Sequence, residues 1–224
     1  MKKTIGTTFL GYCNGNSDLL EQVHNPAVKQ IKPTLLLHAC CGPCTTACVE
    51  RLAKNYDITV YYYNPNITDK EEYRIRRETL IQFINIFNKE NKGICNINYL
   101  EGPYEPERYL IKTKNNKTDS EGGPRCSICF HMRMEETASK ASELGIDYFT
   151  TTLSVSPHKN YEIIRTIGAE LEKKYKTKFL DIDFKKKNGF GRSVEISKEY
   201  GLYRQNFCGC EYTRYSSDKD RKKI

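Results

Sequence analysis

TLLLHACCGPC, residues 34–44, is the stretch that decides the fold. Its first five residues form a short apolar run of the kind found in a strand that is buried on both faces of a sheet. Gly42 and Pro43 then break the run, and Pro43 suits the first turn of a helix. The stretch therefore predicts a buried strand that leads directly into a helix.

A second apolar run, residues 58–63, is rich in β-branched and aromatic residues and predicts the next strand. The unit formed with the helix expected at 44–55 has the length of a right-handed parallel crossover. Further helices are expected at 69–88, 126–144 and 161–176, further strands at 95–100, 148–153 and 179–182, a loop with one short helix at 101–124, and a Lys-rich tail after the last strand. The pattern predicts an α/β protein with a Rossmann-like parallel sheet flanked by helices.

Seven of the ten cysteines fall into three tight clusters. In parallel sheets, ligands bind beyond the carboxyl ends of the strands, and the first cluster directly follows a predicted strand. A fold that brings the three clusters together would create one thiolate-rich site, which is the arrangement that an iron–sulfur centre needs. The clusters are Cys40-Cys41 with Cys44, Cys126 with Cys129, and Cys208 with Cys210.

Two other kinds of site remain open for these cysteines. Cys41 and Cys44 have the CxxC spacing of thioredoxin-type enzymes, at a helix start that favours a thiolate. Cys126 and Cys129 have the spacing of two ligands on one metal, and spacing does not separate zinc from iron–sulfur. Seven candidate thiols exceed the four ligands of one tetrahedral zinc, which favours a [4Fe-4S] cluster together with a second redox or metal element.

The last pair, Cys208 and Cys210, has two readings of its own. It forms either a dithiol that cycles to a strained, reducible disulfide or the ligands of an additional iron, unless it is a chance pair beside the aromatic residues Phe207 and Tyr212. Other candidates are less specific, because histidines are more often core residues and charge runs are more often solvated surfaces. They are His38 and His131 beside the thiols, Glu121 and Asp183 as oxygen ligands or proton donors, and Arg192, Arg204 and Lys185-Lys186-Lys187 as phosphate contacts.

Composition points to the cytoplasm and to an anionic partner. No apolar run reaches the length of a membrane-spanning helix, and the basic start Met1–Ile5 is not followed by the apolar stretch of a secretory signal. Thiols stay reduced in the cytoplasm, where clustered cysteines are metal ligands or redox catalysts more often than disulfides. The net charge is +8, and the chain has sixteen tyrosines and no tryptophan, a composition that suits phosphates and unpaired bases.

The chain is predicted to consist of a peripheral N-terminal extension (1–32), a single α/β catalytic domain (33–213) and a basic C-terminal tail (214–224). Cys13 lies alone in the extension and is not expected to be a ligand. No glycine-rich phosphate loop follows a strand, so bound nicotinamide or ATP is not expected.

Five motifs stand in order along the chain and together resemble the epoxyqueuosine reductases of the QueH type. The resemblance covers about residues 33–213, and an ordered set of motifs is more specific than any single one. The motifs are His38-x-Cys40-Cys41-x-Pro43-Cys44, Glu121-Gly122-Gly123-x-Arg125-Cys126-x-x-Cys129-Phe130, Thr150-Thr151-Thr152-Leu153-x-x-Ser156-Pro157-x-Lys159-Asn160, Asp183-Phe184-x-Lys186-Lys187 and Tyr203-Arg204-Gln205-x-x-Cys208-Gly209-Cys210.

The resemblance implies the last step of queuosine synthesis, in which an epoxide on the modified wobble base of tRNA, position 34, is reduced to an alkene. It also implies a fold akin to the nucleotide α-hydrolases, a [4Fe-4S] cluster and an electron donor that the sequence does not identify. Carried onto this chain, Cys40, Cys41, Cys126 and Cys129 would be cluster ligands. Cys208 and Cys210 would be the redox-active pair or ligands of an adjacent iron. Cys44 is a candidate for that second element, but the resemblance does not assign it. Tyr61, Tyr62, Tyr63 and Tyr203 are candidates for stacking on a base, or core residues.

Overall fold

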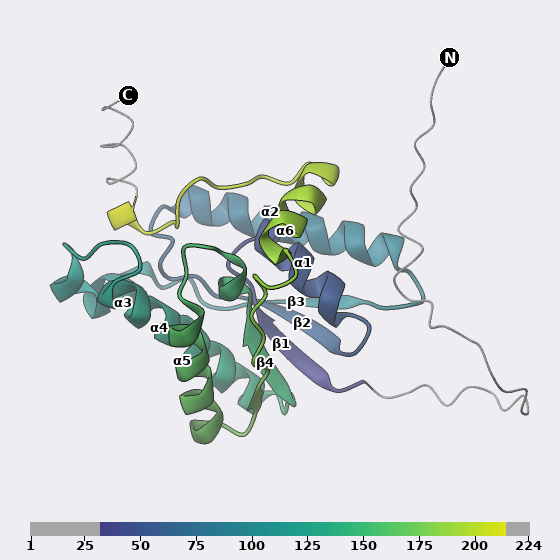
Figure 1. Ribbon diagram of the computed structural model, residues 1–224, viewed down its shortest axis with the longest axis horizontal. Coiled ribbons are helices and arrows are strands. Elements are labelled where there is room, and N and C mark those ends of the chain that lie inside the picture. Colours follow the sequence, from purple (N-terminus) through teal and green to yellow (C-terminus); the bar gives the residue numbers. More distant parts are fainter. Residues whose placement is uncertain (1–31, 214–224) are drawn as a thin grey trace, which may run out of the picture.

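The computed structural model describes residues 32–213, so Cys13, the predicted extension up to residue 31 and the predicted tail at 214–224 lie outside the described residues (Figure 1). The described chain forms one five-stranded sheet with the order β3-β2-β1-β4-β5, and every pair of neighbouring strands is parallel. The strands are β1 (Thr34–His38), β2 (Asp57–Tyr62), β3 (Ile97–Glu101), β4 (Tyr148–Thr151) and β5 (Lys178–Phe179).

Helices cover both faces of this sheet (Figure 1). The fold prediction of a parallel α/β sheet flanked by helices is confirmed, while its Rossmann-like subclass and the division into domains stay predictions. The α-helices are α1 (Gly42–Leu52), α2 (Lys70–Glu90), α3 (Pro106–Lys112), α4 (Pro124–Glu143), α5 (Tyr161–Lys174) and α6 (Gly189–Glu199), and the short 3-10 helices are η1 (Lys114–Asn116) and η2 (Thr152–Val155).

The central strand β1 shows why the sheet has two covered faces. Leu35 and Leu37 pack into a core built with α1 and α2, whereas Leu36 points to a second core built with α4 and α5. All three leucines are fully buried. Since a strand between two helical layers has no solvated face, its sequence is apolar without alternation.

Three loops meet at the carboxyl edge of the sheet, as the sequence pattern predicts. The Asn64 side chain, just beyond β2, donates a 2.9 Å hydrogen bond to the carbonyl of Ala39, just beyond β1. The Cys40 backbone N–H donates a 3.1 Å hydrogen bond to the hydroxyl of Thr152, just beyond β4. Side-chain bonds therefore lock the loops after three neighbouring strands together and place Cys40 between them.

Three predicted elements differ from the structure. The strand expected at 148–153 ends at Thr151, because the Thr151 hydroxyl caps the following 3-10 helix by accepting from the Leu153 N–H. The strand expected at 179–182 is shortened to Lys178–Phe179. The Lys-rich tail expected after that strand contains α6. This helix packs against α1, and its residue Ile196 is buried.

The first turn of α6 depends on a close backbone approach at Gly189. A Cβ at this position would lie 1.8 Å from the carbonyl oxygen of Phe184, a buried core residue. The two residues before Gly189, Lys187 and Asn188, both have positive φ, a conformation that non-glycine residues seldom adopt. A tight turn thus joins the core to α6 and orients the helix on α1.

None of the helices in the described range combines the length and the apolar composition that a membrane span requires.

We predict that Gly189→Ala lowers the free energy of unfolding by about 3 kcal/mol, because the new methyl group meets a backbone carbonyl that cannot move without displacing Phe184. Urea denaturation measures the loss. Gly93→Ala is the matched control, since Gly93 has a positive φ but open space around it, and only backbone strain of about 1 kcal/mol is expected there. Equal losses in the two variants would contradict the close approach.

Candidate metal and redox site

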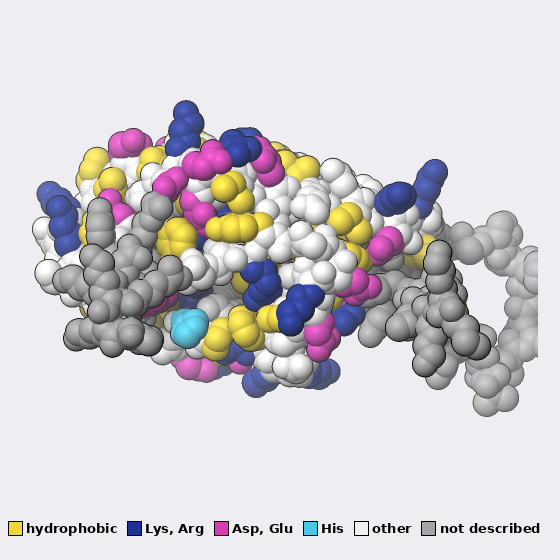
Figure 2. Space-filling view, turned by 90° about the horizontal axis from the view of Figure 1, so that it is seen from above, with side chains coloured by type: hydrophobic (Ala, Val, Ile, Leu, Met, Phe, Trp, Pro, Cys, Tyr) yellow, Lys and Arg dark blue, Asp and Glu magenta, His cyan; other side chains and the backbone are white. Residues whose placement is uncertain are grey.

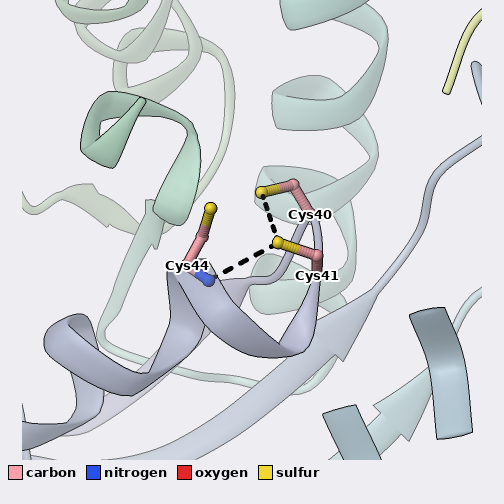
Figure 3. Close-up of side chains that lie close together, drawn as sticks. All are labelled: Cys40, Cys41 and Cys44. Carbon is pink, nitrogen blue, oxygen red and sulfur yellow. Dashed lines mark hydrogen bonds between the residues drawn. The ribbon is translucent and has the colours of Figure 1, made fainter. Parts of the chain in front are cut away.

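The first cysteine cluster lies at the N-terminus of α1 (Figure 3). Cys41 is the N-cap residue, and its sulfur accepts a 3.4 Å hydrogen bond from the Cys44 N–H. The Sγ atoms of Cys40 and Cys41 are 3.8 Å apart, and the three sulfurs of Cys40, Cys41 and Cys44 all lie within 4.8 Å of one another. Gly42 lets this turn approach α2, because a Cβ there would meet the Thr79 carbonyl oxygen at 2.9 Å. The helix start therefore presents three thiols together.

The remaining clustered cysteines lie next to this triad, around a narrow cleft. Cys126 and Cys129 come from the first turns of α4, and Cys126 Sγ accepts a 3.2 Å hydrogen bond from the Gly122 N–H. Cys208 and Cys210 come from the irregular segment after α6 and line the same cleft. Cys208 also lines a larger open cavity of about 390 Å³ that contains Cys40 and Cys44. Cys208 thus connects the cleft with the open cavity.

One arginine holds the Cys208 segment against the rest of the site. Arg76, on α2, is buried and donates to the carbonyl oxygens of Cys208 at 3.0 Å and Phe207 at 3.1 Å. Its Nε donates to Glu72 at 2.6 Å, so the buried charge is paired. Gly209, with φ +102°, passes so close to this guanidinium that a Cβ would lie 3.0 Å from it. The segment lacks a helix or strand of its own and depends on Arg76 for its position.

Positive charge surrounds the open cavity. Four of its lining residues are basic side chains, and Glu121 is the only acidic one among them. Arg133 is buried on α4, donates to Asn64 Oδ1 at 2.6 Å, and has no ion pair with a carboxylate among the described residues. Its Nη1 lies 3.9 Å from Cys129 Sγ, so this guanidinium faces the thiols rather than a carboxylate. The basic lining residues are Arg76, Arg133, Lys159 and Arg204.

The thiols divide into those that favour the thiolate and those that favour the thiol. Hydrogen bonds with Cys41 and Cys44 hold the pKa of Cys40 well below its ordinary value, and Arg133 and Lys159 add to this effect. The hydrogen bond with Cys210 lowers the pKa of Cys208 in the same way, assisted by Lys159 and Arg133. Although burial opposes it, the charges of Cys208 and Cys40 raise the pKa of Lys159 above its ordinary value. The lowered pKa values of Cys40 and Cys208 and the raised pKa of Lys159 therefore favour opposite charges within the same cavity.

The other cysteines are more difficult to ionise. The hydrogen bond with Cys40 raises the pKa of Cys41 to about 11, and burial raises the pKa of Cys129 to about 11. Burial also raises the pKa of Cys126. Because metal ions bind thiolates, these groups would release their protons when a metal enters the site.

His38 is a buried scaffold residue rather than a partner of a thiolate. Its Nε2 lies 3.1 Å from the Tyr63 carbonyl oxygen, which can only accept, so Nε2 carries the proton. Its Nδ1 then accepts from the Thr151 hydroxyl at 2.8 Å. Burial lowers the pKa of His38 to about 3, which keeps the ring neutral. Of the two readings of this histidine, the structure supports the core residue.

Several other sequence candidates lie away from the cysteines. Asp183 lines a separate cavity with Lys186 and Lys187, so it is not an oxygen ligand of the thiol site. His131 lines a groove between α4 and α5. Arg192 pairs with Glu50. By contrast, Glu121 borders both the open cavity and the cleft, and Arg204 borders the open cavity, as the sequence prediction requires.

The tyrosines at the end of β2 and just after it do not reach the surface. Tyr61, Tyr62 and Tyr63 are fully buried, so the hypothesis that they stack on a base is wrong and the alternative of core residues is correct. Tyr203 is 40% exposed, but its hydroxyl bonds to Glu72 at 3.0 Å. The exposed aromatic ring at the open cavity is Phe190, on α6, which is 42% exposed. Basic and hydrophobic side chains also lie side by side on the face of the molecule shown in Figure 2.

Comparison with known proteins gives a consistent result. The family model described as "Epoxyqueuosine reductase QueH" matches residues 35–216. Proteins named epoxyqueuosine reductase QueH from Streptococcus pyogenes serotype M1, Staphylococcus aureus and Thermotoga maritima are 44%, 39% and 36% identical to this chain. The alignments cover 82%, 87% and 80% of this chain and 71%, 81% and 90% of the respective relatives.

The chain belongs to the QueH family. This membership confirms the resemblance drawn from the five motifs, and it makes the chain a member of a family of oxidoreductases. The motifs that carry the QueH resemblance include Gln205 and the thiols. They do not include Arg76 and Arg133, the two buried arginines of the site. Arg133 follows Cys129 by one helical turn, and Glu72 precedes Arg76 by four residues, a spacing that favours an ion pair on a helix. That spacing was the one available signal for Arg76.

We predict that Arg76→Gln lowers the free energy of unfolding by about 3 kcal/mol, because it leaves Glu72 buried without its partner. Hydrogen exchange of residues 203–210 should speed up as the carbonyls of Phe207 and Cys208 lose their donor. The matched control is Arg74→Gln on the same helix. Arg74 is exposed and pairs with Glu71 and Glu78, so a change below about 1 kcal/mol is expected. Equal effects of the two substitutions would show that Arg76 does not anchor the segment.

Proposed function

We propose that the chain reduces epoxyqueuosine at the wobble position of tRNA to queuosine, with an iron–sulfur cluster held by its clustered cysteines. The observation that supports this proposal most strongly is the convergence of cysteines remote in sequence. Cys40 and Cys44 border the open cavity, Cys126, Cys129 and Cys210 border the adjoining cleft, and Cys208 borders both. The printed names of the relatives support the substrate. The basic lining of the open cavity suits an RNA.

The residues present fit an iron–sulfur cluster. Thiolates are its usual protein ligands, and such clusters with four thiolates carry negative charge. The buried Arg133, which has no carboxylate partner in the described chain, supplies a compensating positive charge beside Cys129. In the proposed ligand set, Cys40, Cys41, Cys126 and Cys129 hold a [4Fe-4S] cluster, while Cys44, Cys208 and Cys210 belong to the redox pair or to an additional iron.

The reaction requires two electrons and two protons, because opening the epoxide to an alkene releases its oxygen as water. An iron–sulfur cluster supplies electrons one at a time when it is bound. Oxidation of the Cys208 thiolate and the Cys210 thiol to a disulfide would release two electrons and one proton, and the second proton would come from solvent, which balances the reaction. Lys159 and Arg133 border the same cavity, so their positive charges lie where the departing oxygen develops negative charge. An external donor would then reduce the disulfide again.

A second candidate, an RNA-binding protein with a structural zinc, is favoured by one observation. Four sulfurs at about 2.3 Å from a tetrahedral zinc lie about 3.8 Å apart, and the Cys40 and Cys41 sulfurs have this separation. Metal analysis of anaerobically purified protein separates the two candidates. Iron with broad absorbance at about 400 nm, bleached by dithionite, supports the reductase, whereas colourless protein with stoichiometric zinc supports the zinc site.

The thiol–disulfide oxidoreductase is less well supported. Such an enzyme needs an accessible thiolate at the first position of its CxxC pair. Cys41 is fully buried, and the pKa of its thiol is raised to about 11 by its hydrogen bond with Cys40. An oxidoreductase that used Cys41 and Cys44 alone would tolerate Cys126→Ser.

We predict that Cys126→Ser loses cluster iron and activity together, because it removes a ligand, whereas Cys208→Ser retains part of the iron but stops turnover. Mass spectrometry of nucleosides from epoxyqueuosine-containing tRNA, incubated anaerobically with full-length protein and reductant, measures activity. Cys95→Ser is the matched control, since Cys95 precedes β3 and borders neither the cavity nor the cleft. Normal conversion of epoxyqueuosine by both Cys126→Ser and Cys208→Ser would refute the ligand and redox assignments.

We also propose that Phe190 stacks on an unpaired base at the rim of the open cavity. The Arg204 guanidinium lies over its ring at 5.8 Å, which places a positive charge beside the exposed aromatic surface. Phe190→Ala should weaken tRNA binding by about 1–3 kcal/mol, or roughly 5- to 150-fold, in fluorescence anisotropy.

Ile111→Ala is the control for this experiment. Ile111 is 67% exposed on α3 and does not border the cavity, so its loss removes apolar surface without touching the proposed platform. If the two alanine variants bind tRNA alike, Phe190 is not the stacking residue.

A further inference from the structure

Unpaired polar atoms gather at the open cavity. Six buried side-chain nitrogen or oxygen atoms of the described residues have no hydrogen-bond partner. Three of them belong to residues that line this one cavity: Asn66 Oδ1, Gln205 Oε1 and Arg133 Nε. A buried polar atom without a partner costs about 1–3 kcal/mol. Three such atoms around one space indicate that a polar occupant supplies the missing bonds.

Two of the arginines that line the cavity with these carboxamides already have partners of their own. Arg76 donates to Glu72 and to two backbone carbonyls. Arg204 donates to the Ser193 carbonyl and to the Ser197 hydroxyl, both at 3.1 Å. Asn66 itself is 1% exposed, so bulk solvent does not reach it. The structure thus holds Asn66 and Gln205 in the cavity wall without using their side-chain amides.

The chemistry of a carboxamide limits which ligand groups can occupy the cavity. Each carboxamide offers a donor and an acceptor without charge, which matches a hydroxyl group that donates and accepts. The cavity, at about 390 Å³, is in the size range of sites for small ligands and single nucleosides. Cys40 and Cys208 line it too, so the part of a substrate that reacts at the thiol site must lie beside the same amides.

We propose that Asn66 and Gln205 form the subsite that binds the hydroxylated, epoxide-bearing cyclopentane ring of the substrate and orients it toward the thiols. This inference rests on the proposed function, and it assigns to these two side chains the recognition of the modified ring. Their amides bind its hydroxyl groups, while Phe190 and the basic residues hold the RNA around it. The subsite distinguishes a modified wobble nucleoside from an unmodified guanosine.

The test compares the binding of two tRNAs by full-length, metal-loaded protein. One carries epoxyqueuosine at position 34, and the other carries guanosine there. Asn66→Leu and Gln205→Met keep the size of each side chain but remove its hydrogen bonds. Each should weaken binding of the epoxyqueuosine tRNA about tenfold and raise its KM, with binding of the guanosine tRNA unchanged. Gln82→Met, at an exposed position on α2, is the matched control and should bind both tRNAs as the wild type does.

The outcomes separate this inference from the function on which it rests. Variants that bind both tRNAs as the wild type does, or that lose both equally, would overturn the subsite while conversion by the wild type upholds the function. Loss of iron or of visible absorbance in Asn66→Leu and Gln205→Met would show that the two amides stabilise the metal site. That result would also overturn the subsite. A wild type that prefers neither tRNA and converts neither would overturn both proposals.

Discussion

The bond network of Arg76 is the interaction on which the site depends. The sheet can position only the residues that follow its strands, which accounts for Cys40, Asn64 and Thr152. Cys208 arrives from a segment with no regular structure, 132 residues after Arg76 in the sequence, and its carbonyl is fixed by that guanidinium. A planar group with five donors can hold Glu72 and two carbonyls at once, which a lysine cannot do. The rigid and irregular halves of the site are therefore joined by one side chain.

Charge explains why such a site can exist inside a protein. Several thiols packed together would resist ionisation, because thiolates repel one another and burial disfavours them. Hydrogen bonds from neighbouring thiols offset both effects for Cys40 and Cys208, and the charges of Arg133 and Lys159 add to them. Since Arg133 is buried without a carboxylate partner in the described chain, its own burial is tolerable only beside negative groups. The cations and the thiols are thus mutually dependent, and neither set would be stable in this interior alone.

The sequence determined the parts of this structure that follow from local patterns. The two-sided burial of β1, the helix start at Gly42-Pro43 and the strand-end position of Cys40 were all predictable, because apolar runs and breakers act over a few residues. Helix α6 was not predicted, since its first turn depends on Gly189 fitting against a distant carbonyl and its glycine-rich start has low helix propensity. The role of Arg76 was also hidden, because three arginines in four residues of α2 look alike in sequence and only one of them is buried.

The consecutive tyrosines are a second case in which the sequence pattern alone leaves two structures open. Three consecutive tyrosines at the end of β2 and just beyond it suit either a core or a base-binding surface, and the choice depends on whether helices cover both faces there. Here α4 covers Tyr61 and Tyr63 and α2 covers Tyr62, so all three are used for packing. The exposed aromatic ring at the cavity is Phe190, on the helix that the sequence pattern did not predict. Because α6 carries Phe190 and is followed by Gln205 and Cys208, the described chain from α6 onward forms one wall of the open cavity, while the loop after β1 and helix α1 supply Cys40 and Cys44.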